Sequence, residues 1–352
     1  FGTTAVALSG GLDSRALLAC ADNRERLFAF CCYDEPTREF RTAEAIARAL
    51  DVRFLPLPRP FEYYGDHAAA GVRLAAGMGT FANNHFLGML PRLQAEGVQN
   101  LLTGCYCDYL FKGLPLNRRR HRITGRETLA PFRHEFYFSH HLPDIARPAG
   151  VRERWESRVP AEYQAQDSSA AVFQVEARRT FPLCYEGDNQ QRVVPQRVTG
   201  WPLVLADREI LELYRRIPYR YKLNQSLFRR AVRWLCVGPL AKIPDANTGA
   251  RVDAAPFEQW AVSRWHRVRR KLRRPRQSLA TEESWPNWNY YVAHSRKLAE
   301  LWQHPQPEAF DFFRRLLGPE NVSSDVRFYQ GDRLFLFVSL LTLKLWFEQR
   351  VR

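Results

Sequence analysis

The sequence lacks any apolar run long enough to cross a membrane as a helix. Such a helix needs about 18 or more consecutive apolar residues, and the nearest candidate, Leu334 to Trp346, is shorter and contains Lys344. We therefore expect a buried C-terminal helix there, and no membrane insertion. No signal peptide is recognisable at the start, although truncation would have removed one. Because the sequence begins at Phe1 without a methionine and runs directly into an apolar segment, we expect it to be a piece of a longer protein.

Cysteine and histidine patterns typical of disulfide scaffolds and zinc sites are absent. The seven cysteines are odd in number and form no repeating framework, which suits a reducing cytoplasm. No Cys-x-x-Cys pair occurs, and the nine histidines show no zinc-ligand spacing. No internal repeat is present either. We therefore expect a cytoplasmic globular protein without a structural zinc site.

Acidic residues are outnumbered by basic ones. The chain has 37 Asp and Glu against 52 Lys and Arg, a net charge of +15, which raises polyanions as partners. Eight of the basic residues lie in the stretch Arg264 to Arg276, and four lie in Asn117 to Arg122. Only Trp265 interrupts the longer run, so the aromatic residues typical of nucleic-acid stacking surfaces are few. We expect solvated helix faces or linkers here, and nucleic acid is not expected as a partner.

What the sequence does contain is a regular alternation of strand and helix signals in its first hundred residues. Apolar strand signals at 3–9, 27–33, 53–58 and 100–104 are separated by segments with helical spacing. Strands joined in this way need right-handed crossovers and form a parallel sheet. We predict an α/β fold in which the first hundred residues form a doubly wound parallel sheet and a helical lobe follows, with one domain over residues 1–250. A basic linker or loop is predicted over 251–284 and a helical C-terminal extension over 285–352.

The first predicted strand ends in Ser-Gly-Gly-Leu-Asp-Ser, residues 9–14. A loop that leaves a strand and enters a helix presents backbone N–H groups and the positive end of the helix dipole, which both favour an anion. Gly10 and Gly11 let the main chain approach a phosphate, Ser9 and Ser14 add hydroxyl donors, and Asp13 offers an oxygen ligand to magnesium. The loop lacks the lysine and spacing of the Walker type. A different phosphate site is therefore predicted, with a plain turn capped by Asp13 as the alternative.

This loop resembles the pyrophosphate loop of ATP pyrophosphatases, which cleave ATP between its α and β phosphates. Two further blocks are similar to the synthetase domain of class B asparagine synthetases, so that the resemblance spans about residues 1–231. Residues 101–117 match the second motif of that family at Thr103, Gly104, Asp108, Leu110, Phe111 and Gly113. Residues 189–232 match a third block at Pro202, Ile217, Pro218, Lys222, Leu223 and Arg229.

The resemblance implies a ligase that activates a carboxylate as an acyl-adenylate, releases pyrophosphate and transfers ammonia or an amine. The implied cofactors are ATP and Mg²⁺, and the implied acid is aspartate or a related small carboxylate. The amine donor would be ammonia, supplied in relatives by an upstream glutaminase domain that is absent or truncated here. The oligomeric state is left open, a homodimer included.

The resemblance also assigns roles to individual residues. Asp13 and Asp108 would hold magnesium, and they would act in catalysis together with Lys222 and Arg229. The nucleotide would be bound by Leu8, Ser9, Gly10, Gly11, Asp13, Ser14, Cys32, Thr103 and Gly104.

Several family positions differ in this sequence. The glutamate of the second motif falls on Cys105, the glycine after it on Tyr106, and the lysine that steadies pyrophosphate on Gln225. A glutamine cannot supply the point charge of a lysine, so another cation is expected to compensate. The candidates are Lys222, Arg229 and Arg118. A catalytically silent ATP-binding or scaffold protein is therefore an alternative, and the positive charge leaves a tRNA-modifying ATP pyrophosphatase as a weaker one.

Overall fold

The computed structural model describes residues 2–113, 116, 118–122, 124–130, 194–272, 278–281, 285–304 and 307–350. Its contacts divide the chain into two compact units. The sheet unit comprises Phe1–Gly104, Gln190–Val204 and Arg230–Leu301, and the helical unit comprises Cys105–Asn189, Leu205–Arg229 and Trp302–Arg352. These units reflect packing alone, so the domain borders predicted at residues 250 and 284 stay predictions.

The sheet unit is built on parallel strands that pair in the order β3-β2-β1-β4 among the described residues. Their bounds are β1 Thr4–Ala7, β2 Leu27–Tyr33, β3 Arg53–Pro58 and β4 Asn100–Leu102. Val6 in β1 pairs with Ala29 in β2 and with Leu102 in β4. The inner strands are buried on both faces, as parallel sheets require, and this confirms the predicted α/β fold.

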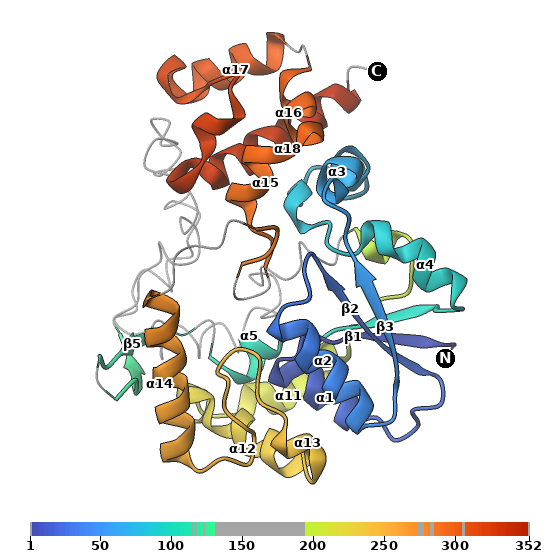
Figure 1. Ribbon diagram of the computed structural model, residues 1–352, viewed down its shortest axis with the longest axis vertical. Coiled ribbons are helices and arrows are strands. Elements are labelled where there is room, and N and C mark those ends of the chain that lie inside the picture. Colours follow the sequence, from blue (N-terminus) through green and yellow to red (C-terminus); the bar gives the residue numbers. More distant parts are fainter. Residues whose placement is uncertain are drawn as a thin grey trace. The chain divides into compact units, whose positions relative to one another are not determined.

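Helices connect these strands by crossovers. Their bounds are α1 Leu12–Ala19, α2 Arg38–Ala49, α3 Tyr63–Leu74 and α4 Leu90–Ala95. Because crossovers are right-handed, α1 and α2 lie on one face of the sheet and α3 and α4 on the other (Figure 1). Strands β2 and β3 are added on one side of β1 and β4 on the other, so the strand order reverses between β1 and β4. In such sheets ligands bind at this switch point, outside the carboxyl ends of the strands.

The last segment of the sheet unit, Arg230–Leu301, lies in sequence between two segments of the helical unit. It contains α13 Pro239–Lys242, α14 Pro256–Leu272, α15 Trp288–His294 and most of α16 Arg296–Gln303. The prediction of a linker or loop over 251–284 is wrong for the 17 residues of α14. Its proline occupies the first helical turn, where a missing N–H is tolerated. The frequent arginines concealed the helical spacing of the apolar residues between them.

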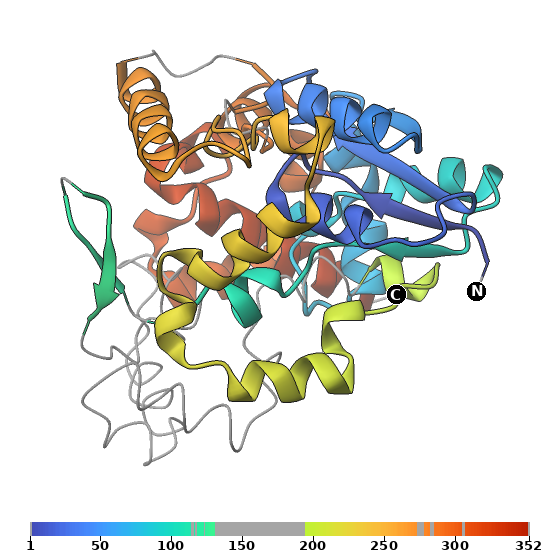
Figure 2. The same cartoon turned by 90° about the horizontal axis from the view of Figure 1, so that it is seen from below.

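The helical unit contains short and long helices and one hairpin among its described residues. Its helices are α5 Cys107–Phe111, α11 Arg208–Arg216, the start of α12 Ser226–Leu235, α17 Pro307–Leu317 and α18 Leu334–Arg350. Strands β5 Arg118–Arg120 and β6 Glu127–Leu129 pair antiparallel in the hairpin, seen in teal in Figure 2. Short 3₁₀ turns in the two units lie at Phe81–Asn83, Leu87–Met89, Pro195–Arg197, Val204–Ala206, Tyr219–Tyr221, Leu223–Gln225, Pro319–Asn321, Val326–Tyr329 and Gly331–Arg333.

The predicted C-terminal helix is confirmed as buried. Phe337 and Leu341 of α18 are fully buried, and the buried Lys344 places its Nζ 2.6 Å from a carboxylate oxygen of Glu348. The ring of Trp302 packs edge-on against Phe337 at 5.5 Å between centroids. Of the helices in the described ranges, none combines the length and the apolar character that crossing a membrane demands.

Candidate functional site

The loop between β1 and α1 is shaped by two glycines. Gly10 has a φ of +69°, in the left-handed region, and a Cβ atom there would lie 2.8 Å from the carbonyl oxygen of Glu39. Only glycine therefore fits at this position. Gly11 is the N-cap of α1 and has no capping side chain, so the first N–H groups of the helix are presented to a ligand.

Two hydroxyl groups organise the same loop. The backbone N–H of Ser9 donates to Ser14 Oγ at 3.1 Å, and the two Oγ atoms lie 3.2 Å apart. The N–H of the buried Leu8 donates to the carbonyl oxygen of Phe30 at 2.8 Å and extends the β1–β2 pairing to the start of the loop. The predicted residues from Leu8 to Ser14 thus form one compact turn at the carboxyl end of β1.

The end of β4 reaches this turn as predicted. A Cβ atom at Gly104 would lie 2.7 Å from Asp13 Cβ and 3.3 Å from the backbone nitrogen of Ser14. Glycine at 104 therefore allows the segment after β4, with Thr103, to approach the first turn of α1. The structure brings together two predicted parts of the nucleotide site that are about ninety residues apart.

Cys32 lies near the carboxyl end of β2. Burial raises the pKa of its thiol to about 12, so the group stays neutral at physiological pH. A neutral thiol is an apolar contact and not a nucleophile. This suits the predicted place of Cys32 beside the base of a nucleotide, which stays a prediction.

Arg15 was missed by the sequence analysis. It is fully buried, and its guanidinium donates to the carbonyl oxygens of Ile243 at 2.7 Å, Pro244 at 2.8 Å and Gly10 at 3.4 Å. Burial lowers the pKa of Arg15, and these carbonyl oxygens replace the water that the side chain has lost. The sequence offered one signal for this role: Arg15 directly follows Asp13 and Ser14 on a helix with a buried face.

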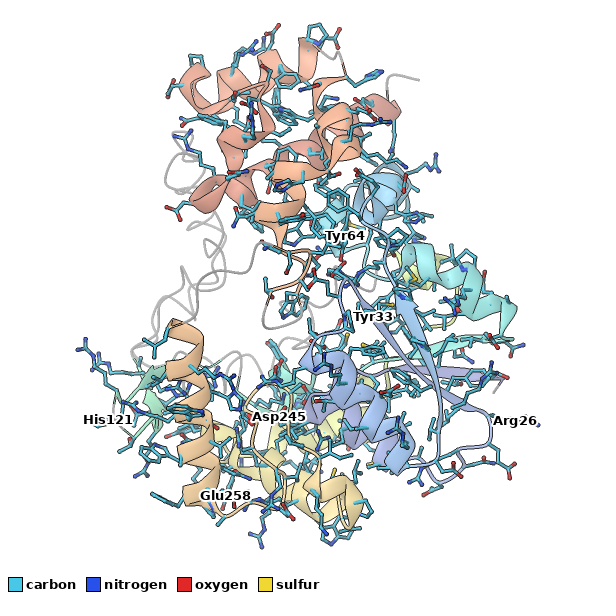
Figure 3. All side chains as sticks on the ribbon, viewed as in Figure 1. Arg26, Tyr33, Tyr64, His121, Asp245 and Glu258 are labelled. Carbon is cyan, nitrogen blue, oxygen red and sulfur yellow. The ribbon has the colours of Figure 1, made fainter. Side chains whose placement is uncertain are left out.

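A turn near residue 246 packs against the loop of residues 9–14, called the phosphate loop after its predicted role. The N–H of Ala246 donates to the carbonyl oxygen of Gly10 at 3.1 Å, and Asn247 Nδ2 lies 3.4 Å from the place of a Cβ at Gly11. Asp245, labelled in Figure 3, holds the turn by accepting from Thr248 Oγ1 at 2.8 Å and from the Asn247 N–H at 3.2 Å. The Asn247 amide is thus a further donor beside the loop that no local sequence pattern indicated.

A second cluster, buried and charged, lies at the carboxyl ends of β2 and β3. Arg59 donates from Nε and Nη2 to the two carboxylate oxygens of Asp34 at 3.0 and 2.8 Å, and Tyr291 OH donates to Asp34 Oδ1 at 2.8 Å. Both charges are therefore paired and hydrogen-bonded. The hydrogen bond from Tyr291, a residue of α15, attaches that helix to the sheet.

A histidine next to this cluster is neutral. His85 Nδ1 lies 2.9 Å from the hydroxyl of Tyr64, which Figure 3 labels. Burial, together with repulsion from Arg59, lowers the pKa of His85 to about 3. The imidazole of His85 is therefore neutral at physiological pH, and it contributes a buried hydrogen bond to the sheet unit.

Asp108, the second predicted magnesium ligand, lies in α5 of the helical unit. Its Oδ1 is 2.9 Å from Lys112 Nζ, and its side chain is about half exposed. Asp108 and Asp13 belong to different units, so their sharing of one metal ion stays a prediction. Across the ranges that the structure describes, no three or more His, Cys, Asp or Glu side chains gather to hold a metal ion.

Comparison with protein families identifies the family of the chain. The family model for asparagine synthase matches residues 2–193, more than half of the 352 residues. The chain belongs to the asparagine synthase family. Its family-level activity is therefore ATP-dependent amidation. No match to the chain was found among curated proteins.

The family match covers the phosphate loop and the second motif. It ends at residue 193, before Lys222 and Arg229, so the roles of these two residues stay predictions. Residues 131–193, the last part of the match, lie outside the described residues together with the beginning of the third block.

The second motif of this asparagine synthase family member has a left-handed backbone at a residue with a large side chain. Tyr106, where the related motif has glycine, has a φ of +71° and is buried. A left-handed conformation costs a residue with a side chain about 1 to 2 kcal/mol. The tyrosine therefore occupies a glycine position, and its buried ring offsets the strain.

The predicted cations of the third block lie in the helical unit. Lys222 is fully buried, with Nζ 3.5 Å from the ring centroid of Tyr214, a cation–π contact. Arg118 pairs with Glu127 at 3.1 Å, which neutralises it. Arg229 is half-buried on α12. Gln225 directly precedes α12 with a φ of +56°. Of the three candidates to replace the family lysine, Arg118 is thus already paired with a carboxylate.

Proposed function

We propose that the chain is an ATP-dependent carbon–nitrogen ligase that activates a small carboxylate as an acyl-adenylate and then forms an amide. The observation that supports this most is the contact between the phosphate loop and the end of β4. Side chains are excluded at Gly10 and at Gly104, so that the backbone of both segments packs closely at the switch point of the sheet. Such a backbone cradle at a helix N-terminus is the usual protein site for a phosphate chain.

The residues of the sheet unit fit the phosphates of ATP. The first N–H groups of α1 and the hydroxyls of Ser9 and Ser14 are donors, and the helix dipole favours the negative charge. The Asn247 amide adds a donor on the other side of the loop. Bound magnesium would neutralise phosphate oxygens, and Asp13 is the carboxylate that the first turn of α1 offers to it. The protein then contributes mainly positioning and electrostatic stabilisation.

Charge on the leaving pyrophosphate must be met by cations of the third block. Gln225 supplies no charge, and the loss of one preorganised donor costs about 3 to 4 kcal/mol of transition-state stabilisation. Lys222 and Arg229 are the cations that we assign to this role. Aspartate or a related acid is the proposed substrate, and ammonia or another amine is the acceptor of the acyl group.

Pyrophosphate exchange tests this proposal directly. The protein is incubated with Mg-ATP and labelled pyrophosphate, together with aspartate or one of a panel of other carboxylates. We expect label to enter ATP only with a suitable acid, and to be lost in Asp13→Ala. The matched control is Asp22→Ala, which removes an exposed carboxylate just beyond α1 and should leave exchange unchanged.

A second outcome of this experiment has its own structural motive. Cys105, Tyr106 and Gln225 replace family residues, so an ATP-binding protein without turnover would also fit the chain. ATP binding that is lost in Asp13→Ala, without exchange for any acid in the panel, would favour this silent protein over the ligase. Acid-dependent exchange that persists in Asp13→Ala would contradict the silent protein and the role proposed for Asp13.

A further inference from the structure

Helix α14 carries large apolar side chains on its exposed side. Phe257 is 77% exposed, Trp265 65% and Leu272 80%, and Trp260 and Val268 are exposed between them. Successive spacings of three, five, three and four residues put these side chains on one broad face along the helix. The rings of Phe257 and Trp260 stack at 5.9 Å between centroids. Large exposed apolar side chains gathered on one helix face mark an interaction surface, because isolated exposed residues would be scattered.

The same helix is strongly basic. By helical spacing Arg264 is exposed within this face and Arg269 is exposed at its edge, on α14, the long orange helix in Figure 2. Glu258 is the one acidic residue in the α14 sequence, and its carboxylate lies 3.5 Å from Arg251 Nη2. The helix itself therefore carries net positive charge, which complements an anionic partner.

The opposite face of α14 is fixed to the sheet unit. His266 Nδ1 lies 3.2 Å from Arg38 Nη1, and a Cβ at Gly249 would lie 2.1 Å from His266 Nε2. Gln259 Nε2 donates to the carbonyl oxygens of Arg251 and Val252, each at 3.3 Å. Because these contacts fix the inner face, the apolar face stays directed away from the sheet unit.

Three partner chemistries can be compared on this surface. Nucleic acid would use the arginines and the tryptophans, but Val268 and Leu272 offer it neither a stacking ring nor a charge. A second copy of the chain would bring the arginines of both helices together at a symmetric interface, with like charges facing each other. An anionic bilayer surface takes aromatic and aliphatic side chains at the headgroup boundary and attracts the flanking arginines.

We infer that α14 docks in the plane of a lipid bilayer that contains anionic lipids. Phe257, Trp260, Trp265, Val268 and Leu272 enter the headgroup boundary, and Arg264 and Arg269 contact the acidic headgroups. This surface is separate from the phosphate loop. The inference therefore does not depend on the proposed ligase activity.

Vesicle flotation tests the inference with the full chain. Vesicles of phosphatidylcholine with about one third phosphatidylglycerol are compared with vesicles of phosphatidylcholine alone. We expect the protein to float with the anionic vesicles, much less with the zwitterionic ones, and less as salt rises. The double variants Trp265→Ser with Leu272→Ser and Arg264→Glu with Arg269→Glu should each weaken binding about tenfold or more.

Matched variants elsewhere control for surface changes in general. Trp234→Ser removes a tryptophan that is 81% exposed on α12, and Arg41→Glu with Arg48→Glu reverses two exposed charges on α2. Both should bind vesicles like the unmodified protein, and equal thermal unfolding midpoints verify that all variants fold.

Three results would overturn the inference. Equal binding to both kinds of vesicle, or equal loss in the control variants, would remove α14 from the interaction. RNA binding that the α14 variants abolish, without vesicle binding, would assign the surface to nucleic acid. A dimer in size-exclusion chromatography that the α14 variants dissociate, again without vesicle binding, would assign it to self-association.

Discussion

Gly10 in the predicted phosphate loop and Tyr106 in the second motif both have a positive φ of nearly the same size, +69° and +71°. At Gly10 the carbonyl of Glu39 and the side chain of Thr42 leave no room for a Cβ atom. At Tyr106 a large ring is present and buried. The left-handed turn is therefore kept in both places for different reasons, close backbone packing in the first and compensation by a buried ring in the second.

This contrast separates a constrained region from a tolerant one. At Gly10 close packing by neighbouring atoms leaves no room for a side chain. At Tyr106 the left-handed turn contains a large side chain. The experiments below test this difference.

The largest effect is expected for Gly10→Ala. The new Cβ would meet backbone at 2.8 Å in a left-handed turn, so we expect a loss of about 3 kcal/mol in the free energy of unfolding, together with loss of ATP binding. Denaturant unfolding and titration calorimetry measure the two effects. The control is Gly97→Ala, where φ is +78° and no atom lies within 4 Å of the new Cβ. Equal destabilisation by the two substitutions would show that close packing at Gly10 contributes nothing.

A second expected effect concerns acid and the sheet unit. The pKa of His85 is about 3 when folded and 6.5 ordinarily, so the unfolded chain binds the extra proton as pH falls below 6.5. The free energy of unfolding should therefore decrease as the pH is lowered, by about 2 kcal/mol from pH 7 to pH 5 from this group. His85→Gln should remove this part of the pH dependence in denaturant unfolding. The exposed His294→Gln is the control, and an unchanged slope in His85→Gln would contradict the assignment.

A lysine at position 225 tests whether the third block lacks a cation that the proposed reaction needs. Gln225→Lys should raise the rate of pyrophosphate exchange about tenfold or more, because a cation stabilises the leaving pyrophosphate. The exposed Gln303→Lys adds the same charge elsewhere and should leave the rate unchanged. An unaltered rate in Gln225→Lys would mean that Lys222 and Arg229 already supply the charge.

The smallest effect isolates the strain at Tyr106. Tyr106→Ala and Tyr106→Gly both remove the buried ring, but only glycine is relaxed at a φ of +71°. We expect the glycine variant to be more stable than the alanine variant by about 1 kcal/mol in denaturant unfolding. The reverse order would show that the turn is not strained and that the comparison with Gly10 fails.

Local sequence determined much of the sheet and of the phosphate loop. The strands predicted at 27–33 and 53–58 have these bounds in the structure, because alternation and apolar content are local properties of the chain. Residues 9–14 could be predicted to lead from a strand into a helix because glycine conformation and helix termini are also local, while their phosphate role stays a prediction. Helix α3 was not predicted, since its run of alanines and glycines gives a weak periodic signal. The arginine-rich α14 was misread as a linker.

Tertiary structure decided which distant segments complete these local elements. The sequence does not show that Arg15 is bound by carbonyls near residue 243, or that Ala246 covers Gly10. Nor does it show that Tyr291 joins Asp34 and Arg59, across more than two hundred residues. Hydrogen bonds within helices and turns depend on neighbours in the chain, so local sequence determines them. Burial and ion pairing depend on which remote surface arrives, and only the folded chain determines that.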